Sequence, residues 1–68
     1  MDFHLKGEFI ELDNLLKATD IAAGGAQARQ FVLDGAVKIN GQVESRIRRK
    51  LRAGDRVEVA GSEITIVT

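Results

Sequence analysis

Residues 24–41, GGAQARQFVLDGAVKING, contain the signals that decide the fold of this 68-residue chain. Apolar residues in the first half of this stretch recur at the spacing of one helix face, with polar residues between them. The apolar members are Ala28, Phe31 and Val32. This spacing predicts a helix over about residues 25–34. Gly35 then stands where a residue with positive φ commonly ends a helix, because glycine has no Cβ to clash.

The second half of the stretch predicts a β-hairpin. Val37 and Ile39 alternate with less apolar neighbours, as in a strand with one buried face. Asn40-Gly41 is the strongest short signal for a two-residue hairpin turn. We expect Val43, after the turn, to resume the inward-facing pattern.

The rest of the chain adds further short elements on both sides of this centre. Alternation predicts a strand over about residues 2–6, and leucines at helical spacing predict a first helix over about residues 11–18. Alternating apolar residues near the end indicate more strands. The residues that carry these patterns are Phe3, Leu5, Leu12, Leu15, Leu16, Val57, Val59, Ile64 and Ile66. The order β-α-α-β-β-β predicts an α+β fold, in which two short helices pack on a small, mainly antiparallel sheet, with residues 1–68 as a single domain.

Positive charge is concentrated after the predicted hairpin. Residues 46–52 are RIRRKLR, and between residues 38 and 56 seven cations face only two anions, a net charge of +5 in a chain whose formal net charge is zero. We expect Ile47 and Leu51 to anchor this run to the core, so that its cations point in fixed directions. Such a patch is typical of a protein that binds a polyanion. The run could also be a solvated face without a partner, and this alternative stays open.

The composition leaves little for catalysis, metal binding or membrane insertion. The chain has no Cys, Tyr or Trp, and His4, expected at the surface, is its only histidine. Ser45 and Ser62 lie in turn-like contexts, without the motifs of a catalytic triad. We therefore expect no enzymatic activity, no cofactor and no metal. No apolar run approaches the roughly 20 residues of a membrane helix and the start does not resemble a signal peptide, so we expect a protein of the reducing cytoplasm.

Four segments resemble the S4 RNA-binding domain in their residues, order and spacing. They are LDNLL (12–16), GGAQARQFVLDG (24–35), AVKING (36–41) and GDRVEV (54–59). The string GAQAR, followed by VKING and VE-x-R-x-R-x-K, is similar in particular to the small stand-alone bacterial proteins of the YbcJ type, in which a short N-terminal strand precedes the domain. The resemblance implies an S4-like (αL-motif) fold with its core over about residues 12–59, and it implies RNA binding.

The resemblance also implies a partner and a site. The partner would be structured RNA of the rRNA or tRNA class, and with it the ribosome. The site would be the face made by the start of the second helix and the hairpin after it. The candidate residues are Gly24, Gly25, Arg29, Lys38, Asn40, Gly41, Arg46, Arg48, Arg49 and Lys50. Gly24 stands where the family often has a capping Ser and Gly25 where a basic residue often follows, which removes one phosphate contact. Glycines at a helix start still leave backbone N–H groups open to a phosphate.

Several candidates also have a purely structural interpretation. Arg29 could pair with Asp34, Lys38 could be an exposed strand lysine, and Asn40-Gly41 is first a requirement of the turn. With Phe31 expected in the core, the chain should lack platforms for base stacking, which favours folded or double-helical RNA as the partner.

Two other functions remain open at this stage. One is a protein-interaction adapter that uses the basic patch, for example on the ribosome. The other is an accessory module of an RNA-modifying enzyme. We expect no membrane partner, and we expect a monomer.

Overall fold

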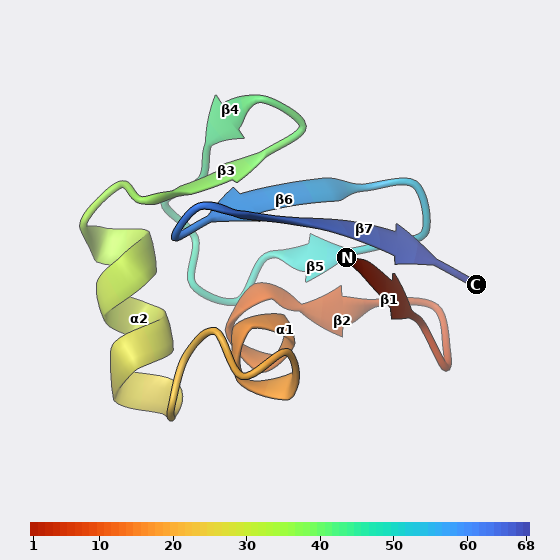
Figure 1. The fold of residues 1–68 in the computed structure, drawn as a ribbon, viewed down its shortest axis with the longest axis horizontal. Coiled ribbons are helices and arrows are strands. Elements are labelled where there is room, and N and C mark those ends of the chain that lie inside the picture. Colours follow the sequence, from red (N-terminus) through yellow and green to blue (C-terminus); the bar gives the residue numbers. More distant parts are fainter.

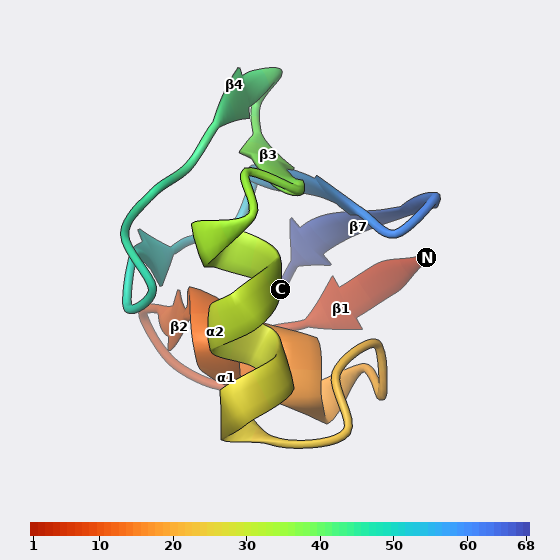
Figure 2. The same ribbon diagram turned by 90° about the vertical axis from the view of Figure 1, so that its left-hand side faces the viewer.

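The chain forms one five-stranded sheet, one two-stranded ladder and two helices in the computed structural model, which describes residues 1–68. The elements in chain order are β1 (Asp2–His4), β2 (Ile10–Glu11), α1 (Leu12–Ala18), α2 (Gly25–Leu33), β3 (Val37–Ile39), β4 (Gln42–Val43), β5 (Lys50–Leu51), β6 (Arg56–Val59) and β7 (Ser62–Val67). Both helices lie on the same side of the larger sheet (Figures 1 and 2). The predicted α+β class is confirmed.

The segment from α2 to β4 adopts the structure that its sequence predicts. Gly35 follows α2 with a φ of 73°, and the chain turns there before β3 begins at Val37. Asn40 and Gly41, with φ of 53° and 86°, form the two-residue turn between β3 and β4. Positive φ at both residues is the requirement of the type I′ turn, which is why Asn-Gly is favoured there.

The larger sheet has the strand order β1-β7-β6-β3-β4. All its pairings are antiparallel except that of β1 with β7, which is parallel and places Phe3 opposite Ile66. The N-terminal strand, predicted over about 2–6, ends at His4, although Leu5 still donates a backbone hydrogen bond to Val67 at 2.7 Å. Strands more than 60 positions apart in the chain are thus paired, and Figure 1 shows β1 lying beside β7.

The two-residue strands β2 and β5 form a separate antiparallel ladder beside α1. Ile10 pairs with Leu51 and Glu11 with Lys50. The predicted order of elements did not contain this ladder, because two residues are too few to show a periodic pattern. The ladder ties the chain before α1 to the end of the cationic run.

The core lies between the sheet and the helices. Its thirteen buried apolar residues are Leu12, Leu15, Leu16, Ala22, Ala28, Val32, Val37, Ile39, Leu51, Val57, Val59, Ile64 and Ile66. Both helix faces predicted from spacing contribute to it, while Phe31 is half-buried and packs against its edge. Neither helix is long and apolar enough to cross a membrane.

The prediction that Val43 points inward is wrong. The two-residue turn pairs Ile39 with Gln42 and Lys38 with Val43, and residues directly opposite each other share one face of a sheet. Val43 therefore lies on the outer face with Lys38, and 59% of it is exposed.

Candidate functional site

A loop of residues 44–49 connects β4 to β5 and carries most of the cationic run; we call it the basic loop. The start of α1 holds it through the backbone: the N–H groups of Leu12 and Asp13 donate to the carbonyls of Arg49 and Ile47, at 2.8 and 3.1 Å. These N–H groups belong to the first turn of a helix and have no partner inside it, so the loop satisfies them. Ile47 packs against the core, as predicted. The path of the basic loop is thus fixed on its inner side.

Glu44 is the buried acid around which the basic loop is arranged. Only 7% of it is exposed, and no other polar or charged residue is buried. Arg46 donates from Nε and Nη2 to its two carboxylate oxygens, each at 3.1 Å, and Arg49 donates from Nη1 at 2.8 Å. The backbone N–H groups of Ser45 and Arg46 add two bonds of 2.9 Å.

These contacts stabilise the charged form of the carboxylate. Hydrogen bonds from Arg46, and then from Arg49, outweigh the opposing effect of burial and lower the pKa of Glu44 from its ordinary value of 4.5 to about 2. The carboxylate in turn fixes two guanidinium groups at the surface, where the Arg46 side chain remains 71% exposed.

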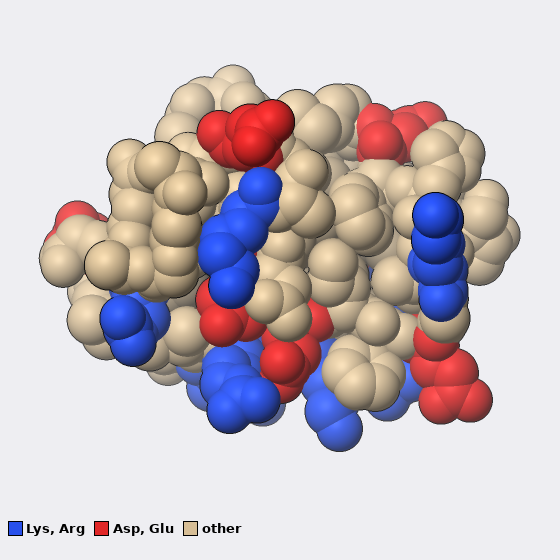
Figure 3. All heavy atoms as spheres, turned by 90° about the horizontal axis from the view of Figure 1, so that it is seen from below, with Lys and Arg blue, Asp and Glu red and all other residues tan.

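Five cations and no carboxylate line one shallow hollow of about 510 Å³, which we call the basic hollow. Its residues are Arg46, Arg48, Arg49, Lys50 and Arg52. Figure 3 shows Lys and Arg side chains gathered along one edge of the face seen from below, with acidic side chains beside them. Four of the five were named as candidates from the sequence, and Arg52 was missed although it belongs to the same run. The structure thus brings the cations of the run to a common side.

A second hollow adjoins the first and is lined mainly by the starts of α1 and α2; we call it the helix hollow. Gly25, Arg29 and Arg48 line it together with acidic and apolar neighbours. The other lining residues are Glu11, Asp13, Asn14 and Ile47. Because Arg48 lines both hollows, they form one continuous surface, in which Arg48 Nε lies 3.3 Å from a carboxylate oxygen of Glu11. Arg29 makes no ion pair with Asp34, whose carboxylate accepts from Gln30 instead.

The start of α2 has no side-chain cap. Gly24 occupies the N-cap position in an extended conformation, and a Cβ at Gly24 or Gly25 would meet nothing within 4 Å. Glycine is therefore not required there by neighbouring atoms of the protein. The backbone at this end of α2 remains open to approach from outside.

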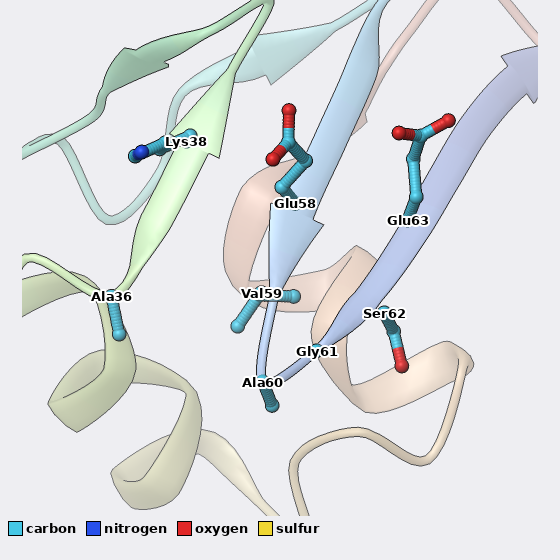
Figure 4. A pocket seen from close by; sticks show the side chains of 8 residues that line it. All are labelled: Ala36, Lys38, Glu58, Val59, Ala60, Gly61, Ser62 and Glu63. Carbon is cyan, nitrogen blue, oxygen red and sulfur yellow. The ribbon is translucent and has the colours of Figure 1, made fainter.

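The candidate RNA-binding residues of the β3–β4 hairpin, Lys38 and Asn40, lie outside both hollows. Lys38 lines a hollow on the outer face of the sheet, opposite Glu58 in register, with Glu63 on the next strand (Figure 4). The side chain of Asn40 is engaged within the protein: it donates to Asp55 and accepts from the backbone N–H of Arg56, both at 3.0 Å. Lys38 is thus not part of the basic hollow, and the amide of Asn40 joins the hairpin to the turn before β6.

In addition to Arg52, the sequence analysis missed two residues of this surface, Glu44 and Phe9. Glu44 was counted only as a negative charge, and its burial depends on the loop conformation. Phe9 is 41% exposed, with Lys50 Nζ 4.8 Å and Arg52 Cζ 5.9 Å from its ring centroid. An exposed aromatic ring therefore lies beside these cations. No group of three or more His, Cys, Asp and Glu side chains is placed to hold a metal ion.

Two helices on one face of a small mixed sheet, with a cationic loop held against the first helix, define a small S4-like domain. The chain belongs to the S4 domain family, whose profile matches residues 3–67. It is 40% identical over 62 residues to the protein named "Putative RNA-binding protein YbcJ" of Escherichia coli (strain K12), covering 91% of this chain and 89% of the relative.

Two other comparisons agree with this assignment. The chain is 37% identical over 54 residues to the "Probable ribosome maturation protein RlbA" of Bacillus subtilis (strain 168), covering 79% of this chain and 76% of the relative. The solution structure of E. coli YbcJ, described as having an αL motif involved in RNA binding, matches with a TM-score of 0.75 and 40% identity over 98% of this chain and 86% of that one. The predicted resemblance to the S4 family and to its YbcJ-type members is confirmed.

Proposed function

We propose that this protein binds folded RNA through the phosphate backbone and has no catalytic activity of its own. The observation that carries the proposal is the basic hollow, where five cations converge and no carboxylate is among the lining residues. The names of YbcJ and RlbA, which refer to RNA binding and to ribosome maturation, support the same conclusion.

The arrangement around Glu44 suits phosphate binding. Arg46 uses Nε and Nη2 for the carboxylate, which leaves Nη1 free to donate to a phosphate oxygen. A guanidinium that is already oriented loses less side-chain entropy when it binds. The uncapped start of α2, which borders the same surface through Gly25, adds backbone N–H groups and the positive end of the helix dipole.

The RNA we propose is ribosomal RNA, free or within a ribosomal particle. This choice is supported by the similarity to the relative whose name refers to ribosome maturation. We infer further that the protein acts in the cytoplasm as a monomer, and that Gly25, Arg29, Arg46, Arg48, Arg49, Lys50 and Arg52 bind the RNA. Lys38 would contribute at most to the long-range field, because it lies beside Glu58 on another face.

A salt titration with charge-reversed variants tests this function. The double variant Arg48→Glu, Lys50→Glu removes two exposed cations without touching the arginines that hold Glu44. Its matched control is Lys17→Glu, Lys38→Glu, which makes the same change of charge at exposed sites outside the two hollows. Binding to a structured rRNA fragment is measured by fluorescence anisotropy between 50 and 200 mM salt, a range over which phosphate contacts strongly affect affinity.

We expect the affinity of the wild type to fall linearly on a log–log plot, and the slope to decrease by about 1 for each phosphate that the variant no longer neutralises. The first double variant should therefore bind much more weakly and with a shallower slope, whereas the control should keep the wild-type slope. Equal affinities for the two double variants, with native circular dichroism spectra, would refute the proposed surface. A nearly salt-independent wild type would favour a protein-interaction adapter instead.

A further inference from the structure

Phe9 is the one aromatic side chain that lies at the surface beside the cations. Phe3 and Phe31 pack against the core, whereas 41% of Phe9 is exposed. The β2–β5 ladder fixes its position: Ile10 pairs with Leu51, and both point toward the core. Phe9 stands immediately before β2, and its exposure places it on the outward side of the ladder.

The two neighbours of Leu51 hold their cations over the ring of Phe9. Lys50 Nζ lies 4.8 Å and Arg52 Cζ 5.9 Å from the ring centroid, both within the range of cation–π attraction. Lys50 and Arg52 also line the basic hollow. The ring therefore lies at the rim of the surface that we propose for phosphate binding.

Phe9 also borders a small, mainly apolar hollow of about 330 Å³. Phe3, Leu5 and Ile10 supply the other apolar walls, and His4 and Lys6 complete the lining. This volume is at the lower end of the range for small-molecule sites. An apolar recess bordered by an exposed ring, with two cations at its edge, is complementary to a flat apolar group that carries a negative charge.

We infer that this hollow receives the base of one unpaired nucleotide, stacked on Phe9, while Lys50 and Arg52 contact its flanking phosphates. The inference rests on the proposed function and makes it more specific: the preferred RNA is a helix interrupted by a bulge or a loop, and not an uninterrupted duplex. The choice of a nucleotide over an apolar peptide follows from charge, since a peptide side chain would leave the two cations without a partner. Any base can stack on an aromatic ring, so the site would bind an unpaired nucleotide without distinguishing which base it carries.

Three RNAs and three proteins test the inference. The RNAs are a short fully paired duplex, the same duplex with one bulged uridine, and the same bulge without its base. The proteins are the wild type, Phe9→Leu, and Leu33→Ala as a control at an apolar residue of α2 that is 65% exposed and lines neither the apolar nor the basic hollow. We expect the wild type and the control to bind the bulged uridine roughly tenfold more tightly than the abasic bulge, as one stacked base contributes on this scale. Phe9→Leu should abolish that difference, and it should weaken binding of the bulged uridine RNA more than binding of the paired duplex.

A fluorescent variant gives an independent measurement. The chain contains no Trp, so Phe9→Trp has a single indole emitter. Its emission should be quenched by the bulged uridine RNA and not by the abasic RNA.

The possible results separate the inference from the function on which it rests. Equal wild-type affinity for the uridine and abasic bulges, or an unquenched Trp, would overturn the inference and leave phosphate binding intact. Equal weakening of all three RNAs by Phe9→Leu would also overturn it, because the ring would then act only by positioning Lys50 and Arg52. Absence of binding to all three RNAs would refute the proposed function as well.

Discussion

Replacing Glu44 by glutamine tests whether one buried carboxylate holds the basic loop in place. Glutamine keeps the size of the side chain and one accepting oxygen, but it loses the charge that Arg46 and Arg49 neutralise. Hydrogen bonds from Arg46 and Arg49 lower the pKa of Glu44 from 4.5 to about 2. At about 1.4 kcal/mol per unit this corresponds to about 3–4 kcal/mol of stability at neutral pH.

The pH dependence follows from the direction of this shift. Because the pKa is lower in the folded state, the stabilisation is complete above pH 4.5 and is lost as the pH falls toward 2. The difference in free energy of unfolding between the wild type and Glu44→Gln should therefore shrink from about 3–4 kcal/mol at pH 7 to about 1.5 kcal/mol at pH 3.

Urea denaturation followed by circular dichroism at several pH values measures this difference. Glu8→Gln is the matched control, since Glu8 is exposed and makes no ion pair. It should leave stability within about 0.5 kcal/mol at every pH. Equal stability of Glu44→Gln and wild type at pH 7, or a difference that does not change between pH 7 and pH 3, would refute the reasoning.

Four further substitutions test the fold. Leu51→Ala should lower the free energy of unfolding by about 2–5 kcal/mol, because Leu51 is fully buried, and denaturant titration measures the loss. Gly35→Ala should cost about 1 kcal/mol through its φ of 73° alone, since the added Cβ would come no closer than 4.0 Å to Val43. Gly25→Ala, which meets nothing within 4 Å and has no positive φ, should be neutral or stabilise by up to about 1 kcal/mol; a loss as large as that of Gly35→Ala would contradict this distinction. Val43→Thr should change the free energy of unfolding little, by about 0.5 kcal/mol or less, and a large loss would mean that Val43 is buried after all.

Local signals in the sequence predicted the parts of the fold that depend on neighbouring residues. The helix that ends before Gly35 and the turn at Asn40-Gly41 follow from backbone preferences of single residues, and both are present. Val43 shows where such reasoning fails. The prediction continued the alternation of buried and exposed residues through the turn, as if the strand were unbroken. The two-residue turn instead pairs Val43 with the exposed Lys38, so Val43 faces outward.

The missing parts depend on contacts that no local pattern encodes. The parallel pairing of β1 with β7 joins residues such as Phe3 and Ile66 across nearly the whole chain. Glu44 is buried because the basic loop folds back on it, and an acidic residue beside a basic run gives no sign of that in the sequence. Phe9 faces the cations only because a two-residue ladder places it there.

For the candidate site, the sequence located the cationic run correctly. It did not show which distant residues lie on the same surface as the run. Ile47 and Leu51 anchor the run, so its cations converge as their spacing implied. The structure joins Arg29 and Gly25 to that surface through Arg48 and separates Lys38 from it. Which distant residues adjoin the run depends on how α1, α2 and the basic loop pack.

Mapping of amide chemical shifts by NMR, during titration with a structured rRNA fragment, tests the central claim most directly. The account predicts that the largest changes fall on residues 46–52, on Gly25 and on Arg29, which line the two adjoining hollows. Changes concentrated instead around Lys38 and Glu58 on the outer face of the sheet, or no changes at saturating RNA, would contradict it.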